Sequence, residues 1–255
     1  MDVITRLLSM GVDVNHQLTR KRPYGQGRGR FQDYDWRGGV GPLFLAAFNS
    51  DAESAEALLK HGAEVDLPNV FQMTPLMVAA GMRGTGGTAG GGGGGGGGGD
   101  RAFKTLDVLL AAGANINAQI SDSHTHTAVL MAYVAGRDQE GRTALMGSAD
   151  AGNDRMAKYL LDHGADPTLK EQKGMTALDI ARSECPPPGL AGNEQQKATC
   201  ERLMAARAGT AKVLEAAMAA KGIAVPPGLT APKANAAAAP AAPAASAPAA
   251  AAPAR

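Results

Sequence analysis

Arginine and aromatic residues gather in residues 16–40, which hold six basic residues against two acidic ones and four of the chain's aromatic side chains. Arg, Tyr and Trp are the residue types that dominate binding hot spots in protein interfaces. The stretch therefore predicts a loop that contacts a partner. The alternative is that the aromatic rings pack the loop onto neighbouring helices while the arginines face solvent. The candidate contact residues are Tyr24, Arg28, Arg30, Tyr34 and Trp36.

The same stretch alternates Arg28 and Arg30 with glycine ahead of Phe31. Such interleaving suits single-stranded nucleic acid, through phosphate contacts and base stacking. However, the whole chain has a formal net charge of only +1. A near-neutral chain has no overall electrostatic attraction to nucleic acid or to acidic membranes. We therefore rank a nucleic-acid contact below a protein contact.

Asp122, His124 and His126 are the residues whose types and spacing come closest to a metal site. Alternating positions of an extended segment share one face, so both imidazoles could meet a metal ion. Two histidines with one aspartate and no cysteine make a poor ligand set, and we predict no metal site and no cofactor. The apolar residues 128–134 predict a short helix or strand packed on the rest of the chain.

An unbroken glycine run from Gly90 to Gly99 resembles a phosphate-binding loop only superficially. A P-loop ends in Gly-Lys-Ser/Thr and leads from a strand into a helix. Here Asp100 and Arg101 follow the run, and no strand pattern precedes it. We predict a flexible linker between two helices instead.

Cys185 and Cys200 flank a proline-rich stretch and are the only cysteines. They could form a disulfide that closes a loop of about 15 residues, or remain free thiols in a reducing compartment. Neither has His and Asp partners at a spacing typical of nucleophilic catalysis. Since paired carboxylates and a catalytic triad are also missing from the pattern, we predict that the chain is not an enzyme.

The elements that must position these residues recur with a fixed spacing. Leu43 and Gly62 are 19 residues apart, as are Leu145 and Gly164; Gly62 precedes Leu76 by 14 residues, as Gly164 precedes Leu178. The period is therefore 33 residues. The recurring segments are PLFLAA with LLKHGAEVD, TPLMVAA with LLAAGANIN, TALMGSA with LLDHGADP, and TALDIA.

This pattern resembles the ankyrin repeat, which has a period of about 33 residues and a T-P-L-H-x-A signature, and the segments are similar to those of bacterial ankyrin proteins. The resemblance implies an all-α solenoid of about five helix–turn–helix units, joined by hairpin fingers. It also implies that the protein binds other proteins.

Single residues predict where the helices begin and end. Thr74 can cap the free N–H groups of a helix that begins at Pro75. Gly62 can adopt the left-handed conformation that ends a helix. His61 and His163 each precede such a glycine, and we predict that they face the carbonyl end of the helix.

Three insertions of 18 residues interrupt the array, and each falls at an exposed turn, where a solenoid tolerates additions. The domain map follows as a repeat domain over 1–222 and a disordered Ala/Pro-rich tail over 223–255. The repeat domain divides into a half repeat 1–15, a finger 16–40, repeats 41–66 and 67–117 with a Gly-rich insertion 83–100, a finger 118–137, and repeats 138–167 and 168–222 with a Cys-flanked insertion 185–200.

The half repeat 1–15 lacks its first helix, and Val3, Ile4, Leu7 and Leu8 should expose an apolar edge. We expect either a truncated or mis-started chain, or another chain that covers the edge. The N-terminal residues do not form a signal peptide, and no uncharged apolar run is long enough to span a membrane. The compartment and the oligomeric state stay open.

The sequence thus predicts a protein–protein interaction module that binds its partner through the concave helix face and the enlarged fingers. The alternative is an accessory or substrate-targeting part of an enzyme. A metal site in the second finger and a nucleic-acid contact are ranked lower.

Overall fold

The computed structural model describes residues 3–18, 39–69, 72–82, 99–121, 140–184 and 194–226, with side chains from 197 in the last range. Within these ranges the chain forms helices and turns and no strand. The all-α prediction is confirmed. In order, the helices are α1 (Val3–Ser9), α2 (Pro42–Phe48), α3 (Ala52–Lys60), α4 (Pro75–Ala79), α5 (Asp100–Ala111), α7 (Ala144–Ala151), α8 (Asp154–Asp162), α9 (Ala177–Arg182) and α10 (Glu194–Ala220).

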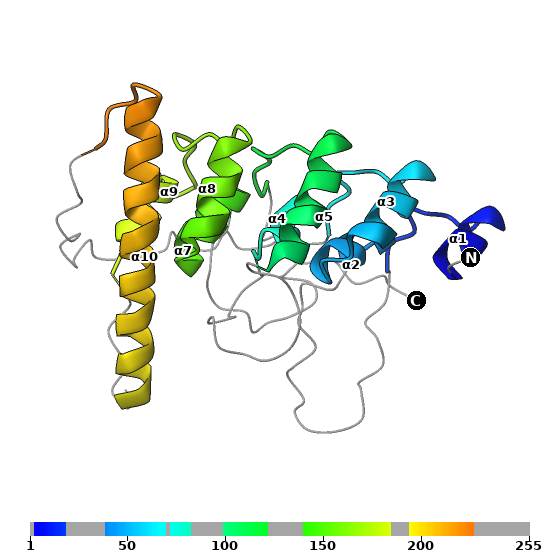
Figure 1. The fold of residues 1–255 in the computed structure, drawn as a ribbon, viewed down its shortest axis with the longest axis horizontal. Coiled ribbons are helices and arrows are strands. Elements are labelled where there is room, and N and C mark those ends of the chain that lie inside the picture. Colours follow the sequence, from blue (N-terminus) through cyan, green and yellow to red (C-terminus); the bar gives the residue numbers. More distant parts are fainter. Residues whose placement is uncertain are drawn as a thin grey trace, which may run out of the picture.

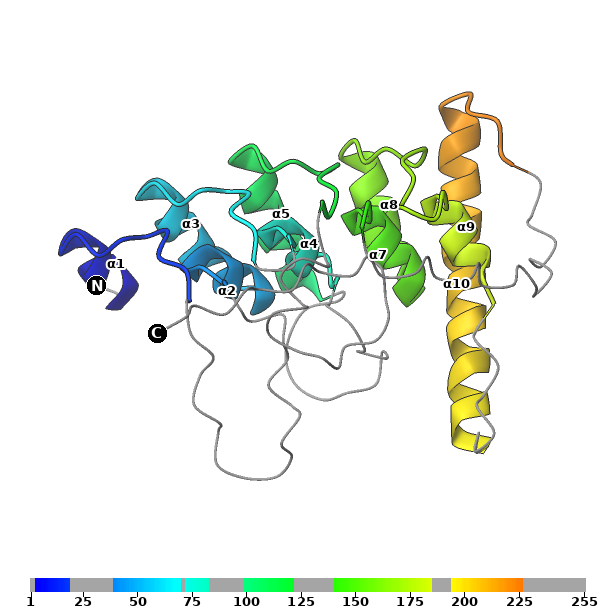
Figure 2. The same ribbon diagram turned by 180° about the vertical axis from the view of Figure 1, so that it is seen from behind.

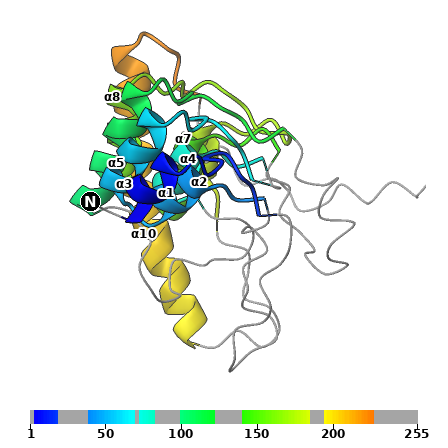
Figure 3. The same cartoon turned by 90° about the vertical axis from the view of Figure 1, so that its right-hand side faces the viewer.

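The helices form two rows that run the length of the molecule (Figure 1). The inner row is α2, α4, α7 and α9, which Figure 2 shows from behind, and the outer row is α1, α3, α5, α8 and α10. Each inner helix packs against the outer helix that follows it, and neighbouring inner helices also pack against one another. The segments that link one pair to the next, here called fingers, all leave the helices on the same side (Figure 3). This arrangement is a helical solenoid, as predicted.

Threonine caps begin three of the inner helices, α4, α7 and α9. The side chain of Thr74 accepts a hydrogen bond from the Met77 amide, and Thr143 does the same for Met146. Thr176 forms a reciprocal pair with Asp179, in which each side chain accepts from the other residue's backbone N–H. Such capping satisfies amides that have no partner inside the helix.

Glycine ends the outer helices, as Gly62 and Gly164 illustrate with φ values of 88° and 96°. The residue after each glycine donates its amide back into the last helical turn, a bond that this left-handed conformation permits. The Nδ1 atoms of His61 and His163 lie 2.8 Å from the carbonyl oxygens four residues earlier. The predicted place of both histidines, at the carbonyl end of a helix, is confirmed.

The core follows the predicted leucine positions. Leu76 and Leu178 of the inner row are fully buried, and Leu109 and Leu160 of the outer row are buried behind them. Phe44 is also buried, while Phe48 is partly buried against the same core. One continuous cluster of buried side chains therefore joins all of the helix pairs.

One boundary differs from prediction. Helix α10 begins at Glu194, inside the predicted insertion 185–200, so Cys200 lies inside a helix and not at the end of a loop. Cys200 is disulfide-bonded, and the sequence holds one other cysteine, Cys185. The first half of α10 consists largely of residues with high helix propensity, which extend the helix beyond the repeat pattern.

Helix α1 exposes only part of its predicted apolar edge. Val3 is 70% and Leu7 46% exposed. Ile4 and Leu8 instead pack against the core, because α1 lies against α3.

Candidate binding site at the bases of the long fingers

Two fingers are much longer than the others, and backbone hydrogen bonds close each of them at its base. In the first, the Leu18 amide donates to the Val40 carbonyl over 3.1 Å and the Gly39 amide donates to the Leu18 carbonyl over 3.0 Å. In the second, the Ile120 amide donates to the Arg142 carbonyl over 3.1 Å, and the Gly141 amide donates to the Ile120 carbonyl over 2.7 Å. Both loops therefore leave the array from a base that is closed by the same two backbone hydrogen bonds.

A glutamine amide reinforces each base. The Nε2 of Gln17 donates to the carbonyl oxygens of Gly39 and Pro68, both over 2.7 Å. The Nε2 of Gln119 donates to Gly141 over 2.7 Å and to Lys170 over 3.0 Å. Each glutamine thus closes its own long finger and ties that finger to the next, shorter one.

An asparagine two residues before each glutamine makes further hydrogen bonds to the backbone of the next finger. Asn15 donates through Nδ2 to the Gly62 carbonyl over 3.1 Å and accepts the Glu64 amide on Oδ1 over 2.8 Å. Asn117 repeats both bonds with the Gly164 carbonyl and the Asp166 amide. These paired side-chain bonds hold neighbouring fingers at a fixed separation.

At the second long finger, the backbone of the base also lies close to the backbone of the last finger. Gly141 has φ of 78°, and a Cβ placed on it would lie 2.8 Å from the Cα of Glu171. Only glycine fits there without a shift of the last finger.

Buried charges connect the second long finger to the C-terminal helices. Arg142 Nε donates to Glu171 Oε2 over 2.8 Å, and its Nη1 reaches Asp150 over 3.2 Å. Arg207 of α10 binds the other oxygen of Asp150 and also donates to the Asp150 carbonyl. The Glu171 and Arg207 side chains are 1% and 8% exposed. Four charges in a row therefore link a finger base to α7 and α10.

The first long finger lacks this network. Val40 occupies the position of Arg142, and Asn69 occupies that of Glu171. Val40 is 1% and Asn69 2% exposed. The bases of the two long fingers thus share their backbone and glutamine bonds, and differ in the polarity of what packs beneath them.

The candidate residues predicted from sequence lie outside the described residues. This holds for the hot-spot candidates, the possible metal ligands, the apolar segment 128–134 and most of the glycine run. Those candidates are Tyr24, Arg28, Arg30, Tyr34, Trp36, Asp122, His124 and His126.

The residues at the finger bases were missed by the sequence analysis. The available signal was the recurrence of Asn15-x-Gln17 as Asn117-x-Gln119, 102 residues later. Two polar residues per finger do not disturb the leucine and glycine periodicity, so the helix pattern alone does not reveal them.

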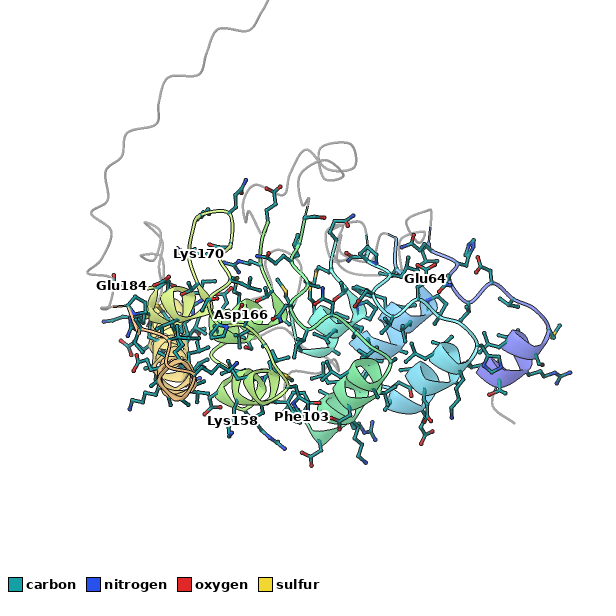
Figure 4. All side chains as sticks on the ribbon, turned by 90° about the horizontal axis from the view of Figure 1, so that it is seen from above. Glu64, Phe103, Lys158, Asp166, Lys170 and Glu184 are labelled. Carbon is teal, nitrogen blue, oxygen red and sulfur yellow. The ribbon has the colours of Figure 1, made fainter. Side chains whose placement is uncertain are left out.

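A shallow depression lies on the opposite, outer side, between α5 and α8. It measures about 190 Å³ and is lined by Phe103, Arg155, Lys158, Tyr159 and Asp162. Figure 4 places Phe103 and Lys158 at this outer edge, and Lys170 toward the finger edge. The depression is therefore separate from the finger bases.

Side chains bridge α5 and α8 at this depression. The rings of Phe103 and Tyr159 lie 4.9 Å apart, and the Arg155 guanidinium lies 4.6 Å from the Phe103 ring centre. The Tyr159 hydroxyl donates to Asp107 over 2.5 Å. Partial burial and this hydrogen bond to a carboxylate raise the pKa of Tyr159 well above its usual value.

Two absences hold for the part of the chain that the structure describes. No three His, Cys, Asp or Glu side chains there come together as a metal site would need. No helix in those ranges has both the length and the apolar character needed to cross a bilayer.

Two family models match the chain. A model described as ankyrin repeats (many copies) matches residues 134–181, which include α7, α8 and nearly all of α9. A model described as a single ankyrin repeat matches residues 38–70, which include α2 and α3. Each match takes in only the later side of a long finger's base, Gly39 and Val40 in one case and Gly141 and Arg142 in the other.

Proposed function

The chain is an ankyrin repeat protein, and on this premise we propose that it is a non-catalytic module that binds another protein through its two long fingers and the concave face of its inner helices. Ankyrin repeats are generally protein–protein interaction modules. The finer assignment, to these fingers and this face, is ours.

The observation that carries the proposal is the shared construction of the two bases. Gln17 and Gln119 each bind one carbonyl of their own finger and one of the next finger. A loop whose ends are held in this way starts from a fixed place on the surface. Binding then loses less entropy than it would with a loop that also had to find its position.

The sequence of the first long finger suggests the kind of partner. Six basic residues against two acidic ones favour an acidic protein surface, because complementary charge steers association and excludes wrong partners. Tyr24, Tyr34 and Trp36 would supply the apolar contact area that charge alone lacks. Arg28 and Arg30 would bind carboxylates, with the planar fork geometry that suits them.

The test is a triple variant, Arg28→Ala with Arg30→Ala and Trp36→Ala, in the full chain. We expect crosslinked affinity capture to lose the partner that the unmodified chain retains, while the thermal unfolding midpoint stays unchanged. A matched control replaces the exposed helical residues Lys104 and Lys197 with Ala, which removes the same number of charges elsewhere. Equal recovery of the partner by the triple variant and the control would exclude the first long finger as the contact surface.

A further inference from the structure

Helix α10 consists of a half that packs on the array and a half that extends beyond it. Arg207 is its first buried residue among the side chains that the structure describes, and Leu214 and Met218 follow in the core. None of the described side chains before Arg207 in this helix belongs to the core or packs against it. Figure 1 shows the first half of α10 running past the ends of α7 and α8. Packing on the core therefore does not hold this half in place.

A disulfide ties the first half of α10 to the chain instead. Cys200 is disulfide-bonded and partly buried, and Cys185 is the only other cysteine of the sequence. Cys185 comes two residues after Ser183, which ends α9. Figure 4 places Glu184, the residue between them, at the α10 end of the molecule. The disulfide therefore links the end of α9 to the half of α10 that core packing leaves unsupported.

Arg207 joins the same two segments a little further along α10. Its Nη1 donates to the carbonyl oxygen and to the Oγ of Ser183, each over 3.3 Å. Cys200 and Arg207 are seven residues apart, which is about two helical turns, so they lie on one face of the helix. Without the disulfide, the bonds between Ser183 and Arg207 must close a span of 24 residues without a crosslink nearby. Closing a longer loop costs more chain entropy, so reduction should weaken these bonds.

Arg207 is also the last member of the row of buried charges that leads to the second long finger. It binds one carboxylate oxygen of Asp150 and donates to the Asp150 carbonyl over 2.8 Å. The other carboxylate oxygen of Asp150 lies 3.2 Å from Arg142 Nη1. The Arg142 carbonyl in turn accepts the Ile120 amide that closes the finger base. A continuous series of contacts therefore joins the disulfide end of α10 to that base.

We propose that the disulfide of Cys200 is a redox-sensitive control on the base of the second long finger, transmitted through Arg207 and Asp150. While the disulfide is intact, Arg207 stays against α7 and α9, and Asp150 keeps its place beside Arg142. When the disulfide is reduced, the first half of α10 is released, Arg207 leaves Asp150 more often, and the finger base opens more often. The effect on partner binding rests on the proposed function, whereas the opening of the base is measured on the chain alone.

The reductant is a dithiol. One of its thiolates attacks a sulfur of the protein disulfide and forms a mixed disulfide, which the second thiolate then displaces. The S–S bond of the protein breaks, both of its sulfurs end as thiols, and the dithiol becomes a cyclic disulfide. Two electrons and two protons thus pass from the dithiol to the protein.

The first long finger provides an internal control, because its base has no such connection. Val40 and Asn69 stand there in place of Arg142 and Glu171. Helix α10 contacts α7, α8 and α9 and no earlier helix within the described residues. A change that starts at Cys200 should therefore reach the second base and leave the first unaffected.

The first experiment compares the oxidised full chain with the same chain reduced by dithiothreitol, by amide hydrogen exchange under native conditions. We expect the amides of Ile120 and Gly141 to exchange about fivefold faster after reduction, the lower end of typical coupling between sites. The amides of Leu18 and Gly39 should keep their rates. Unchanged exchange at the second base, or equal acceleration at both bases, would overturn the proposal. So would failure of the air-oxidised chain to lose both free thiols in a thiol assay.

The second experiment tests the route with variants of the full chain. Cys200→Ser should show the fast exchange at the second base without dithiothreitol and no further response to it. Arg207→Gln should also lose the response, and Asp150→Asn tests the same link if Arg207→Gln does not fold. Arg202→Gln is the matched control, because Arg202 is an exposed cation of the same helix and its variant should respond fully.

A full response in Arg207→Gln or Asp150→Asn would overturn the route through these residues. No partner is present in either experiment, so the outcome is independent of whether the long fingers bind a protein. Loss of the proposed function would appear as unchanged partner capture by the triple variant of the first long finger, with the redox response of the second base intact.

Discussion

Arg142 donates its Nε–H to Glu171 over 2.8 Å, and this ion pair joins the base of the second long finger to the last finger. The Glu171 side chain is 1% exposed, and its other oxygen has no hydrogen-bond partner within the described residues. The pair is therefore shielded from water, and one Glu171 oxygen lacks a hydrogen bond. Removing Arg142 would leave the Glu171 charge buried without a partner, which is strongly destabilising.

Arg142→Ala should lower the free energy of unfolding by about 3–5 kcal/mol, because it leaves a buried carboxylate without its cation. Urea denaturation measures the change. The double variant Arg142→Val with Glu171→Asn copies the pair found at the first long finger, Val40 and Asn69, and should recover most of the loss. A double variant as unstable as the single one would show that the charge pair is not the cause.

Gln17→Ala should open the first long finger at its base while leaving the second unchanged. The variant removes two hydrogen bonds to backbone carbonyls, and leaving such groups unsatisfied costs about 1–3 kcal/mol each. Hydrogen exchange should show faster exchange at the amides of Leu18 and Gly39. The amides of Ile120 and Gly141 serve as the internal reference, and Gln119→Ala should reverse the pattern. Uniform acceleration at both bases would argue against separate clamps.

Gly152→Ala should destabilise the chain more than Gly62→Ala, although both glycines have positive φ. A Cβ at Gly152 would lie 2.7 Å from the Cβ of Ala206, whereas nothing lies within 4 Å of one at Gly62. Backbone strain, about 1–2 kcal/mol, is common to both variants. Overpacking against α10 should add about 1–3 kcal/mol at Gly152 alone. Thermal unfolding of the two variants side by side measures the difference, and equal losses would refute the close approach.

Stability should fall as the pH rises above about 10, the pKa of an unperturbed tyrosine, and Tyr159 should account for part of that fall. Its pKa is raised in the folded protein, by partial burial and then by the hydrogen bond to Asp107. The folded state therefore keeps the hydroxyl proton when the unfolded state has lost it, so this stabilisation is complete below pH 10 and is lost above it.

Tyr159→Phe tests this assignment, since it removes the titrating group but keeps the ring that packs on Phe103. The difference in unfolding midpoint between pH 9 and pH 11 should shrink in the variant. An unchanged pH dependence would mean that other groups titrate instead.

The helical framework was predictable because its determinants repeat along the chain. Leu76 and Leu178 are buried, and Thr74 and Gly62 bound their helices as the spacing indicated. Each of these residues acts within its own helix or the next turn. Local chemistry recurring at a fixed interval is visible without knowledge of the three-dimensional contacts.

The finger bases were not predictable in the same way, because their contacts join residues far apart in sequence. Gln17 reaches a carbonyl 51 residues away, and Arg207 reaches Asp150 across 57 residues. On α1, the apolar pattern identified the helix but could not separate Ile4, which packs against the core, from exposed Val3. That distinction depends on which neighbours are present.

Long and short fingers alternate along the array, so the bases of the two long fingers lie two helix pairs apart. At about 8–10 Å between packed helices, this places them on the order of 20 Å from each other. A ligand the size of a single side chain or a small metabolite could reach only one of them. A partner that binds both bases at once must be broad or elongated. Its second contact would then form at the high effective concentration that the first contact provides.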